Sequence, residues 1–257
     1  MKFTHVISFS ALFFIGSAAS AQDFKVPVAN TKEASVTLKD FPGDIPIEGY
    51  SGSEIIITGD ANHETPERAK GLKPIYPGGV DNTGQGIKLE KNGDQVTLTY
   101  LLPITNEGRE YKIKVPENVY LKLTSGCERQ TDAHVQNMKG EVEINICGNI
   151  SLKHVSGPLV LSTISGNIDV VFSEVSKDKP ISIASISGEI DVTLPANTPA
   201  TVEMSNISGS MYSDFDFHSD DKDMKRIGGN SINGQINGGG VDLKIHDISG
   251  NIYLRKG

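Results

Sequence analysis

Short runs in which hydrophobic and polar residues alternate occupy most of the chain. Residues 34–38, 54–58 and 95–102 alternate in this way, and no stretch has a convincing helical period. Successive side chains of a β-strand point to opposite faces, so this alternation is the pattern of half-buried strands. The sequence therefore predicts an all-β protein.

A five-residue phrase, Ile-Ser-Gly followed by Asn or Glu and then Ile, recurs through the second half of the chain. Full copies begin at Ile164, Ile186 and Ile248, and looser copies begin at Thr124, Ile146 and Ile207. The central glycines are Gly126, Gly148, Gly166, Gly188, Gly209 and Gly250, at intervals of 22, 18, 22, 21 and 41 residues. Repeats of about 20 residues made of short strands are typical of a β-solenoid, in which each unit buries its apolar face against the next.

The last interval is close to two periods, so we expect an excursion from the stack within residues 213–240 and a return at Val241. Residues 22–118 carry strand-like runs without the tight repeat, and we interpret them as an irregular β-rich N-terminal part or cap. Residues 119–257 are then the solenoid repeats. The 27 glycines and the absence of tryptophan suit such a stack better than a conventional core.

Apolar columns appear when each central glycine is taken as position zero. Positions +2 and +4 are expected to face inward, and they hold Ile150, Ile168, Ile190, Met211 and Ile252, then Leu152, Val170, Val192 and Leu254. The first copy has Glu128 and Gln130 there, which suggests a degenerate first rung. Apolar residues also stand at −5, as in Leu161, and at −2, as in Ile164. This interval of three breaks the strand period, so we place a bend between two faces there.

Residues 1–21 have the features of a secretory signal peptide. Lys2 precedes the apolar stretch 6–15, and an Ala-x-Ala site ends at Ala21. No other segment is apolar enough to span a membrane. The formal charge of −8 becomes −9 when Lys2 is removed with the peptide. An acidic chain without a basic cluster argues against nucleic acid and anionic membrane surfaces as partners.

Cys127 and Cys147 are the only cysteines, and export would place them in an oxidising compartment. They stand about one repeat apart, so a disulfide could join neighbouring rungs. Aligning the repeats on Gly126 and Gly148 instead puts them two columns out of register. The alternative is two free thiols, with Cys147 in the serine column.

Asp169 and Asp191 occupy the same column one repeat apart and should lie about one strand spacing from each other. Two such carboxylates could ligate Ca²⁺ or form an acid/base pair that cleaves polysaccharide. An outward column screened by water and nearby basic residues is the alternative.

Other acidic segments also raise the question of calcium, which the sequence leaves open. They are the loop 81–84 and the carboxylates Asp214, Asp216, Asp220, Asp221 and Asp223. Solvated loops explain them equally well. His134 and His154 are one repeat apart and could stack as a weak metal site, with surface scatter as the alternative. No nucleophile elbow, phosphate loop or cysteine-pair zinc motif is present, so we expect neither a catalytic site nor a cofactor.

The chain resembles the putative-adhesin family, a group of exported, autotransporter-adhesin-like β-strand-repeat proteins of unknown function that is widespread in Bacteroidetes. The resemblance rests on the signal peptide, on residues 43–50, 71–75, 81–84 and 111–116, and on the Ser-Gly-Asn/Glu-Ile repeats. It implies a single-stranded, right-handed β-helix-like solenoid and a place in the cell envelope, in the periplasm or on the outer surface of a Gram-negative bacterium. It brings no established catalytic or binding residues.

The sequence thus favours an exported, non-catalytic β-solenoid that binds envelope polysaccharide or a surface protein. The repeated Asn149, Asn167 and Asn251 suit multivalent contacts, although asparagine also suits corners. Two alternatives remain: a carbohydrate-active enzyme that uses Asp169 and Asp191, and a structural protein that assembles through open solenoid ends.

Overall fold

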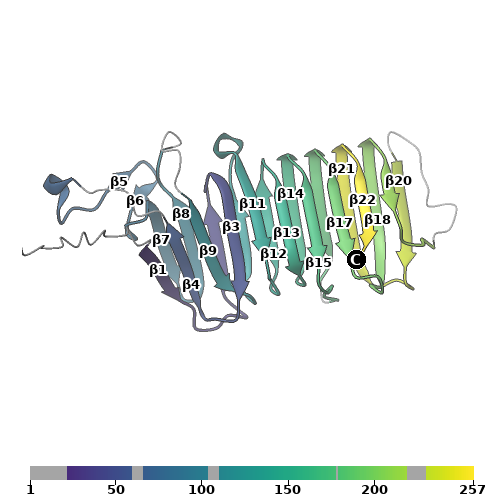
Figure 1. Ribbon diagram of the computed structural model, residues 1–257, viewed down its shortest axis with the longest axis horizontal. Coiled ribbons are helices and arrows are strands. Elements are labelled where there is room, and N and C mark those ends of the chain that lie inside the picture. The colour runs from purple at the N-terminus through teal and green to yellow at the C-terminus, as the bar shows by residue number, and fades with distance from the viewer. Residues whose placement is uncertain (1–21, 60–65, 104–109, 178, 219–229) are drawn as a thin grey trace, which may run out of the picture.

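The computed structural model describes residues 22–59, 66–103, 110–177, 179–218 and 230–257 (Figure 1). The expected signal peptide, residues 1–21, lies outside the described residues. Strands predominate, and the helical segments are two short 3₁₀ turns, η1 (Glu67–Ala69) and η2 (Cys127–Arg129). The all-β prediction is confirmed. Within the described ranges, neither turn is long or apolar enough to cross a bilayer.

Two ten-stranded sheets contain most of the chain. Sheet A holds, in spatial order, β1 (Gln22–Pro27), β4 (Glu54–Gly59), β9 (Tyr111–Pro116), β3 (Gly43–Tyr50), β11 (Thr131–Gln136), β13 (Ile150–Val155), β15 (Ile168–Phe172), β17 (Ile190–Leu194), β22 (Ile252–Lys256) and β19 (Met211–Ser213). Sheet B holds β20 (Asn230–Ile236), β18 (Ala200–Ser208), β21 (Val241–Ser249), β16 (Ile181–Ser187), β14 (Leu159–Ser165), β12 (Val142–Ile146), β10 (Tyr120–Thr124), β2 (Ser35–Lys39), β8 (Gln95–Tyr100) and β7 (Ile87–Asn92). A separate hairpin consists of β5 (Ile75–Tyr76) and β6 (Gly79–Val80).

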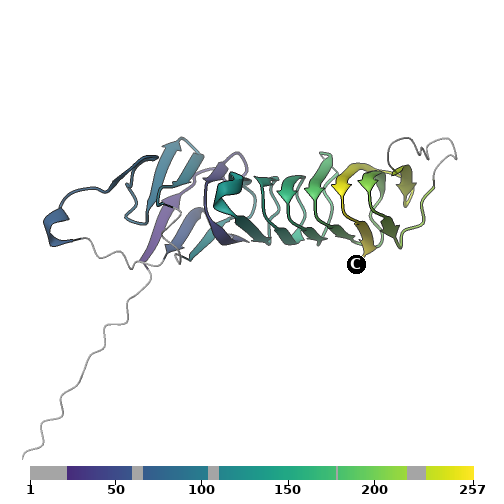
Figure 2. The ribbon, with the colours of Figure 1, turned by 90° about the horizontal axis from the view of Figure 1, so that it is seen from above.

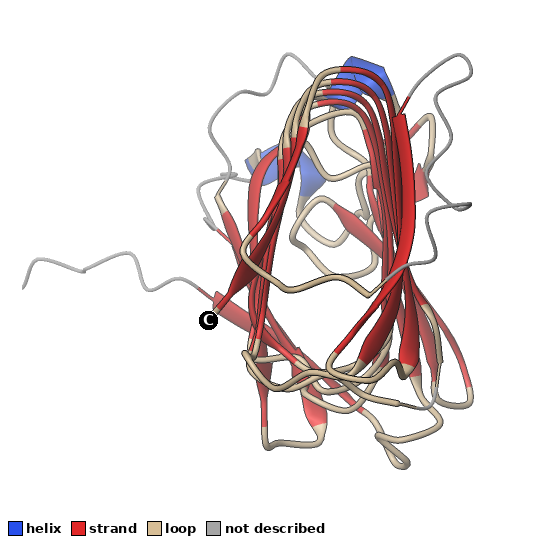
Figure 3. Ribbon diagram, turned by 90° about the vertical axis from the view of Figure 1, so that its right-hand side faces the viewer, coloured by secondary structure: helices blue, strands red, loops and turns tan. Residues whose placement is uncertain are grey.

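The two sheets face each other along the whole length of the molecule, and the core fills the space between them (Figures 2 and 3). A rung is a strand of sheet B followed by a strand of sheet A, for example β14–β15. The inward columns at +2 and +4 are buried in the central rungs, as in the ladder Ile150, Ile168, Ile190 and Ile252. Each fully buried Ile or Leu contributes roughly 1.5–3 kcal/mol relative to exposure.

The order of rungs in space differs from their order in the chain. The last rung, β21–β22, lies between β16–β17 and β18–β19, because β21 pairs with both β16 and β18. The first rung, β2–β3, likewise lies between β8–β9 and β10–β11. Antiparallel strands, such as β4, β7 and β20, stand near the two ends.

One expectation is therefore corrected. The chain does not wind as one continuous single-stranded helix, because its sheets are mixed and both end regions carry an inserted rung. The 41-residue interval between Gly209 and Gly250 corresponds to one step in the stack, and β21 begins at Val241, where the return was expected. Between the two glycines the chain adds β20 at the end of sheet B and returns to fill the place beside β16.

The first repeat is also corrected. After β10 the chain makes the turn η2, and Ala133 rather than Glu128 stands in register with Ile150. Ala133 and Val135 are buried and supply the inward positions of β11. The rung is regular inside, and Glu128 and Gln130 belong to an insertion at its corner.

No bend separates positions −5 and −2. The sheet B strands continue through both, so the inward side includes position −3, which is polar: Thr163, Ser185, Asn206 and Asp247 are buried. From the Gly166 repeat onward the isoleucines at −2 point outward, and Ile164, Ile186, Ile207 and Ile248 are 37–56% exposed. Ile146, at −2 of the Gly148 repeat, is buried because it stands in register with Thr163. Successive side chains of a strand alternate between its two faces, so burying the outward isoleucines would expose the apolar residues that now face the core.

The repeated glycine is explained by a close approach of backbones at the corner between the sheets. A Cβ atom on Gly188 would lie 2.0 Å from the carbonyl oxygen of Gly166, and one on Gly250 would lie 1.8 Å from that of Gly188. Gly188 also has a φ of +143°, which an L-residue with a side chain rarely adopts. From Gly166 onward, each corner therefore requires glycine in order to stack on the neighbouring rung.

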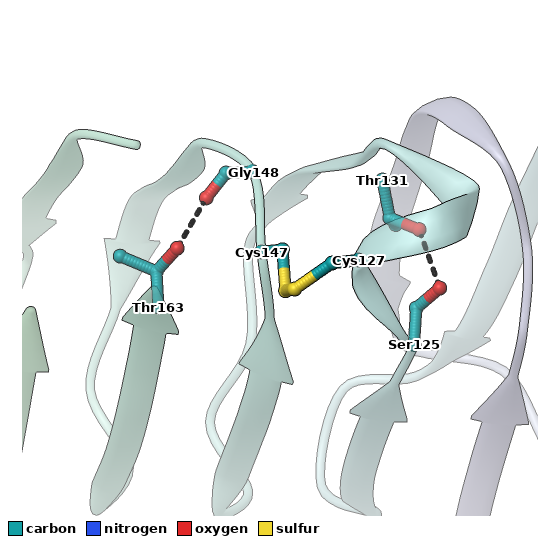
Figure 4. Close-up of a disulfide and its surroundings, with 6 residues drawn as sticks. All are labelled: Ser125, Cys127, Thr131, Cys147, Gly148 and Thr163. Carbon is teal, nitrogen blue, oxygen red and sulfur yellow. Dashed lines mark hydrogen bonds between the residues drawn. A yellow bond between two sulfur atoms is a disulfide. The ribbon is translucent and has the colours of Figure 1, made fainter. Parts of the chain in front are cut away.

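A disulfide joins Cys127, in η2, to Cys147, directly after β12 (Figure 4). The two Cα atoms are 5.0 Å apart, which is within the usual range for a bridge. Aligning Gly126 with Gly148 puts the two cysteines two columns out of register, but the turn η2 lies outside this register and brings Cys127 beside Cys147. Beside it, the Thr131 hydroxyl lies 2.7 Å from the Ser125 hydroxyl.

Replacing Gly188 by alanine should destabilise the protein by about 1–3 kcal/mol, because the new methyl group must displace the backbone of Gly166. Urea unfolding followed by circular dichroism measures this. Ser187→Ala, at the exposed neighbouring position, should change stability by less than about 0.5 kcal/mol. Equal effects of the two substitutions would contradict the packing explanation.

Removing the bridge with Cys127→Ser and Cys147→Ser together should lower the free energy of unfolding by about 3 kcal/mol, as expected for closure of a loop of this length. Reductant should destabilise the unmodified protein by a similar amount and leave the double variant unchanged. Two thiols that react in the folded protein without reductant would show that the bridge does not form.

Candidate functional site

The outward side of sheet A carries one continuous row of polar and aromatic side chains. Register partners on six neighbouring strands supply it: His134, Ser151, Asp169, Asp191, Tyr253 and Tyr212. We call these six residues the outer row. Because each strand rests on a fixed ladder of backbone hydrogen bonds, neighbouring members stand about 4.7–4.9 Å apart at the backbone.

Asp169 and Asp191 are neighbours in this row. The Nε atom of Arg255 lies 2.8 and 2.9 Å from the two carboxylate oxygens of Asp191, so the Asp191 charge is compensated. Partial burial, followed by the charges of Asp191 and Glu189, raises the pKa of Asp169 above its usual value. The pair is thus one compensated carboxylate beside one that holds its proton more tightly.

Tyr212 and Tyr253 form a stacked pair at the end of the row, with ring centroids 5.3 Å apart and planes inclined by 12°. The guanidinium carbon of Arg255 lies 5.1 Å from the Tyr253 ring centroid. We call Tyr212, Tyr253 and Arg255 the tyrosine platform. β19 is the last strand of sheet A, so among the described strands none covers the outer side of the Tyr212 ring, which is 53% exposed.

Hydrogen-bonding groups surround the platform. The Tyr253 hydroxyl donates to Oε1 of Glu189 at 3.2 Å, and the Asn251 amide donates to the same oxygen at 3.1 Å. These contacts fix the Tyr253 ring relative to the corner of the stack. The result is a rigid aromatic surface edged by carboxylate, amide and guanidinium groups.

A shallow groove of about 310 Å³ lies on the same face, at the other end of the row, where His134 and Ser151 line it. Its lining includes Lys112, Lys114, Lys153, His134 and Pro46. Lys114 pairs with Glu48 at 3.0 Å, while Lys112 and Lys153 are exposed. The face therefore changes from basic at the groove to acidic and aromatic at the platform.

The asparagine ladder is part of the scaffold. The side-chain oxygen of Asn149 accepts from the backbone N–H of Asn167, and that of Asn167 accepts from the N–H of Glu189, both at 2.9 Å. Asn251 accepts from Ser210 in the same way. These oxygens are used to join successive rungs, so the corner interpretation accounts for them.

The loop carboxylates and histidines that the structure describes do not gather into a cluster of three or more. Both oxygens of Asp81 accept hydrogen bonds from its own loop, from the backbone N–H groups of Thr83, Gly84 and Gly86 and from the Thr83 hydroxyl. Within the described ranges, no group of three or more His, Cys, Asp or Glu side chains could hold an ion.

The remaining candidates are separate from one another. Asp214 accepts from the Lys256 N–H at 2.8 Å, and Asp216 lies 3.9 Å from the Lys256 ammonium. Asp220, Asp221 and Asp223 lie outside the described residues. His134 is in register with Ser151, not with His154, so the two histidines do not stack, in agreement with the alternative of surface scatter.

Sequence reasoning missed the tyrosine platform. Both tyrosines stand at the +3 position that also holds Asp169 and Asp191, so the column was visible. Because 41 residues separate their repeats, the spacing alone did not show that Tyr212 and Tyr253 are neighbours. Only the insertion of β21–β22 beside β18–β19 makes them neighbours.

Comparison with solved structures finds a similar fold in a protein from Clostridium sporogenes that is named a "putative cell adhesion protein". It is 13% identical, the match covers 92% of this chain and 99% of that chain, and the TM-score is 0.50. A "putative adhesin" from Bacteroides fragilis is 12% identical with a TM-score of 0.34, over 93% of this chain and 98% of that chain. No curated protein matches the chain.

The family assignment rests on the sequence match. The model of the Toastrack family, DUF4097, matches residues 17–255 and so includes nearly all of the chain. The resemblance to the putative-adhesin family is thereby confirmed. The chain belongs to the Toastrack DUF4097 family.

Proposed function

We propose that the mature protein is an exported, non-catalytic recognition module of the bacterial cell envelope, and that its outer row binds an extended polysaccharide. The observation that carries this proposal is the exposed face of Tyr212, stacked on Tyr253 at the open end of sheet A. The C–H face of a pyranose ring packs well on such an aromatic face, while its hydroxyl groups need donors and acceptors at the rim.

The platform supplies both requirements at low entropic cost. Tyr253 is held by Arg255 and by its hydrogen bond to Glu189, and Tyr212 is held by the Tyr253 ring. A ligand that binds there orders few side chains, which preserves affinity. The straight row and the groove at its other end extend the contact over several sugar units, as a repeating polymer would require.

A carbohydrate-cleaving enzyme is the second candidate, favoured by the raised pKa of Asp169 beside Asp191. Retaining and inverting mechanisms both need a second carboxylate free to attack sugar or activate water. Arg255 contacts both oxygens of Asp191, which favours a binding role. Product release from a polysaccharide panel, lost in Asp169→Asn, would support the enzyme instead.

The proposal also includes the organisation of the exported chain. We infer that residues 1–21 are a signal peptide, that residues 22–118 form the N-terminal part or cap, and that residues 119–257 form the solenoid repeats. The platform then lies at the end of the stack far from the N-terminal part (Figure 1). Periplasm and outer surface both remain compatible with this arrangement.

Tyr212→Ala should weaken polysaccharide binding about tenfold, because an aromatic stacking contact contributes roughly 0.5–1.5 kcal/mol. Residues 22–257 are titrated with polysaccharides selected on a glycan array and with intact cells. Tyr212→Phe should bind normally, since it keeps the ring.

Ile186→Ala provides the control on sheet B, where it removes an exposed apolar side chain of the opposite face. Its binding should equal that of the unmodified protein. The proposal would be refuted if the unmodified protein bound no glycan and no cell. It would also be refuted if Tyr212→Ala bound as tightly as the unmodified protein.

A further inference from the structure

Asp247 is an acidic side chain in the interior of the stack. It lies on β21, its exposure is 0%, and neither carboxylate oxygen has a partner with hydrogen-bond geometry. In register it stands beside Ser185 on β16 and beside Asn206 on β18. A buried carboxylate without partners costs several kcal/mol if it is ionised, so its state needs an explanation.

Two other members of this polar column make the same kind of contact, whereas the buried Ser185 hydroxyl has no hydrogen-bond partner. Thr163 donates from its hydroxyl to the carbonyl oxygen of Gly148 at 2.7 Å, and Asn206 donates from its amide to that of Gly250 at 2.6 Å. In both cases a hydrogen-bond donor at position −3 reaches the corner glycine of the neighbouring rung. The column satisfies corner carbonyls that face the interior.

Asp247 occupies the same place as Asn206. A Cβ atom built on Gly209 would lie 1.8 Å from the Gly250 oxygen and 2.8 Å from Nδ2 of Asn206. A Cβ atom built on Gly250 would lie 1.8 Å from the Gly188 oxygen and 2.9 Å from Oδ2 of Asp247. Oδ2 of Asp247 therefore lies near the Gly188 carbonyl oxygen, in the place that corresponds to the donor nitrogen of Asn206.

An ionised carboxylate can only accept hydrogen bonds, as can a carbonyl, so the two oxygens would repel each other. We propose that Asp247 is a neutral carboxylic acid that donates its proton to the carbonyl oxygen of Gly188, and that this bond fastens the inserted rung β21–β22 to the rung β16–β17. The acid would then donate a hydrogen bond to a corner carbonyl, as the Thr163 hydroxyl and the Asn206 amide do.

The surroundings of Asp247 agree with a neutral acid. Its register partners on β16 and β18 are uncharged, and Glu189, which follows Gly188, is exposed. On its own strand, Asp242, Lys244 and His246 are exposed, and Nδ1 of His246 lies 2.8 Å from the Ser205 hydroxyl. Burial raises the pKa of Asp247, opposed by the backbone N–H groups of Ile248 and Ser249 and by His246.

The sign of the pH dependence follows. The folded pKa lies above the unfolded value of about 3.9, so the stabilisation is complete below that value and is lost as pH rises through the folded pKa. One proton is involved, so the opening equilibrium of the rung changes at most about tenfold per pH unit. Because β22 carries Tyr253 and Arg255, the bond also supports the tyrosine platform.

Asp247→Asn tests the proposal because it puts the donor of Asn206 at this position. Hydrogen–deuterium exchange of the β21–β22 segment is compared between the two proteins at each pH from 4 to 8. We expect equal protection at pH 4 and at least tenfold greater protection of Asp247→Asn at pH 8. Asp247→Ala, which removes the donor, should be less protected at both.

The control and the direct readout separate this acid from other groups. Asp169→Asn should keep the pH dependence of the β21–β22 segment, because Asp169 lies on the exposed face. The infrared C=O band of a protonated acid should be present in the folded protein and absent from Asp247→Asn.

Three results would overturn the proposal. The β21–β22 segment could exchange faster in Asp247→Asn than in the unmodified protein at pH 8. The protection of this segment could also depend on pH in the same way in both proteins. A chelator could instead lower protection in the unmodified protein alone, which would indicate a bound cation between the carboxylate and the Gly188 oxygen. None of these outcomes depends on whether the outer row binds polysaccharide.

Discussion

The close approach of backbones at the glycine corners is the constraint on which the rest of the structure depends. From Gly166 onward, the carbonyl group of one corner glycine lies where a side chain on the corner glycine of the neighbouring rung would place its Cβ atom. This contact sets both sheets at one rung spacing and keeps the outer row straight. At Gly126, where the turn η2 interrupts the stacking, a Cβ atom would instead meet the side chain of Glu128. The disulfide between Cys127 and Cys147 joins the rungs at that corner.

The inserted rungs make the two end regions of the stack non-local. β21 pairs with β16 and β18, and β2 pairs with β8 and β10. Each inserted rung therefore contacts at least one rung that is distant from it in the sequence. The tyrosine platform forms only when β22 lies between β17 and β19. The tyrosine platform therefore exists only once the chain has closed the stack, so the proposed binding would depend on complete folding.

The polar interior column shows how the corner constraint shapes the sequence. Closely stacked corners leave carbonyl groups directed toward the interior, and buried carbonyls need donors. Thr163 and Asn206 supply them, and the isoleucines at the next position are turned outward as a consequence. Polar side chains are thus buried and apolar ones exposed because backbone groups must be paired. The same requirement accounts for a protonated Asp247.

By itself the sequence determined the strands, the buried columns of the central rungs, the adjacency of Asp169 and Asp191, and the family. These features depend on alternation and on repeat spacing, which are local. Tertiary structure alone decided the order of rungs, the pairing of Tyr212 with Tyr253, and the inward direction of Asp247. From the Gly166 repeat onward the rungs present similar strands and the same corner glycine to their neighbours, so local pattern does not specify which rung follows which. Only the closure of the whole stack selects one order.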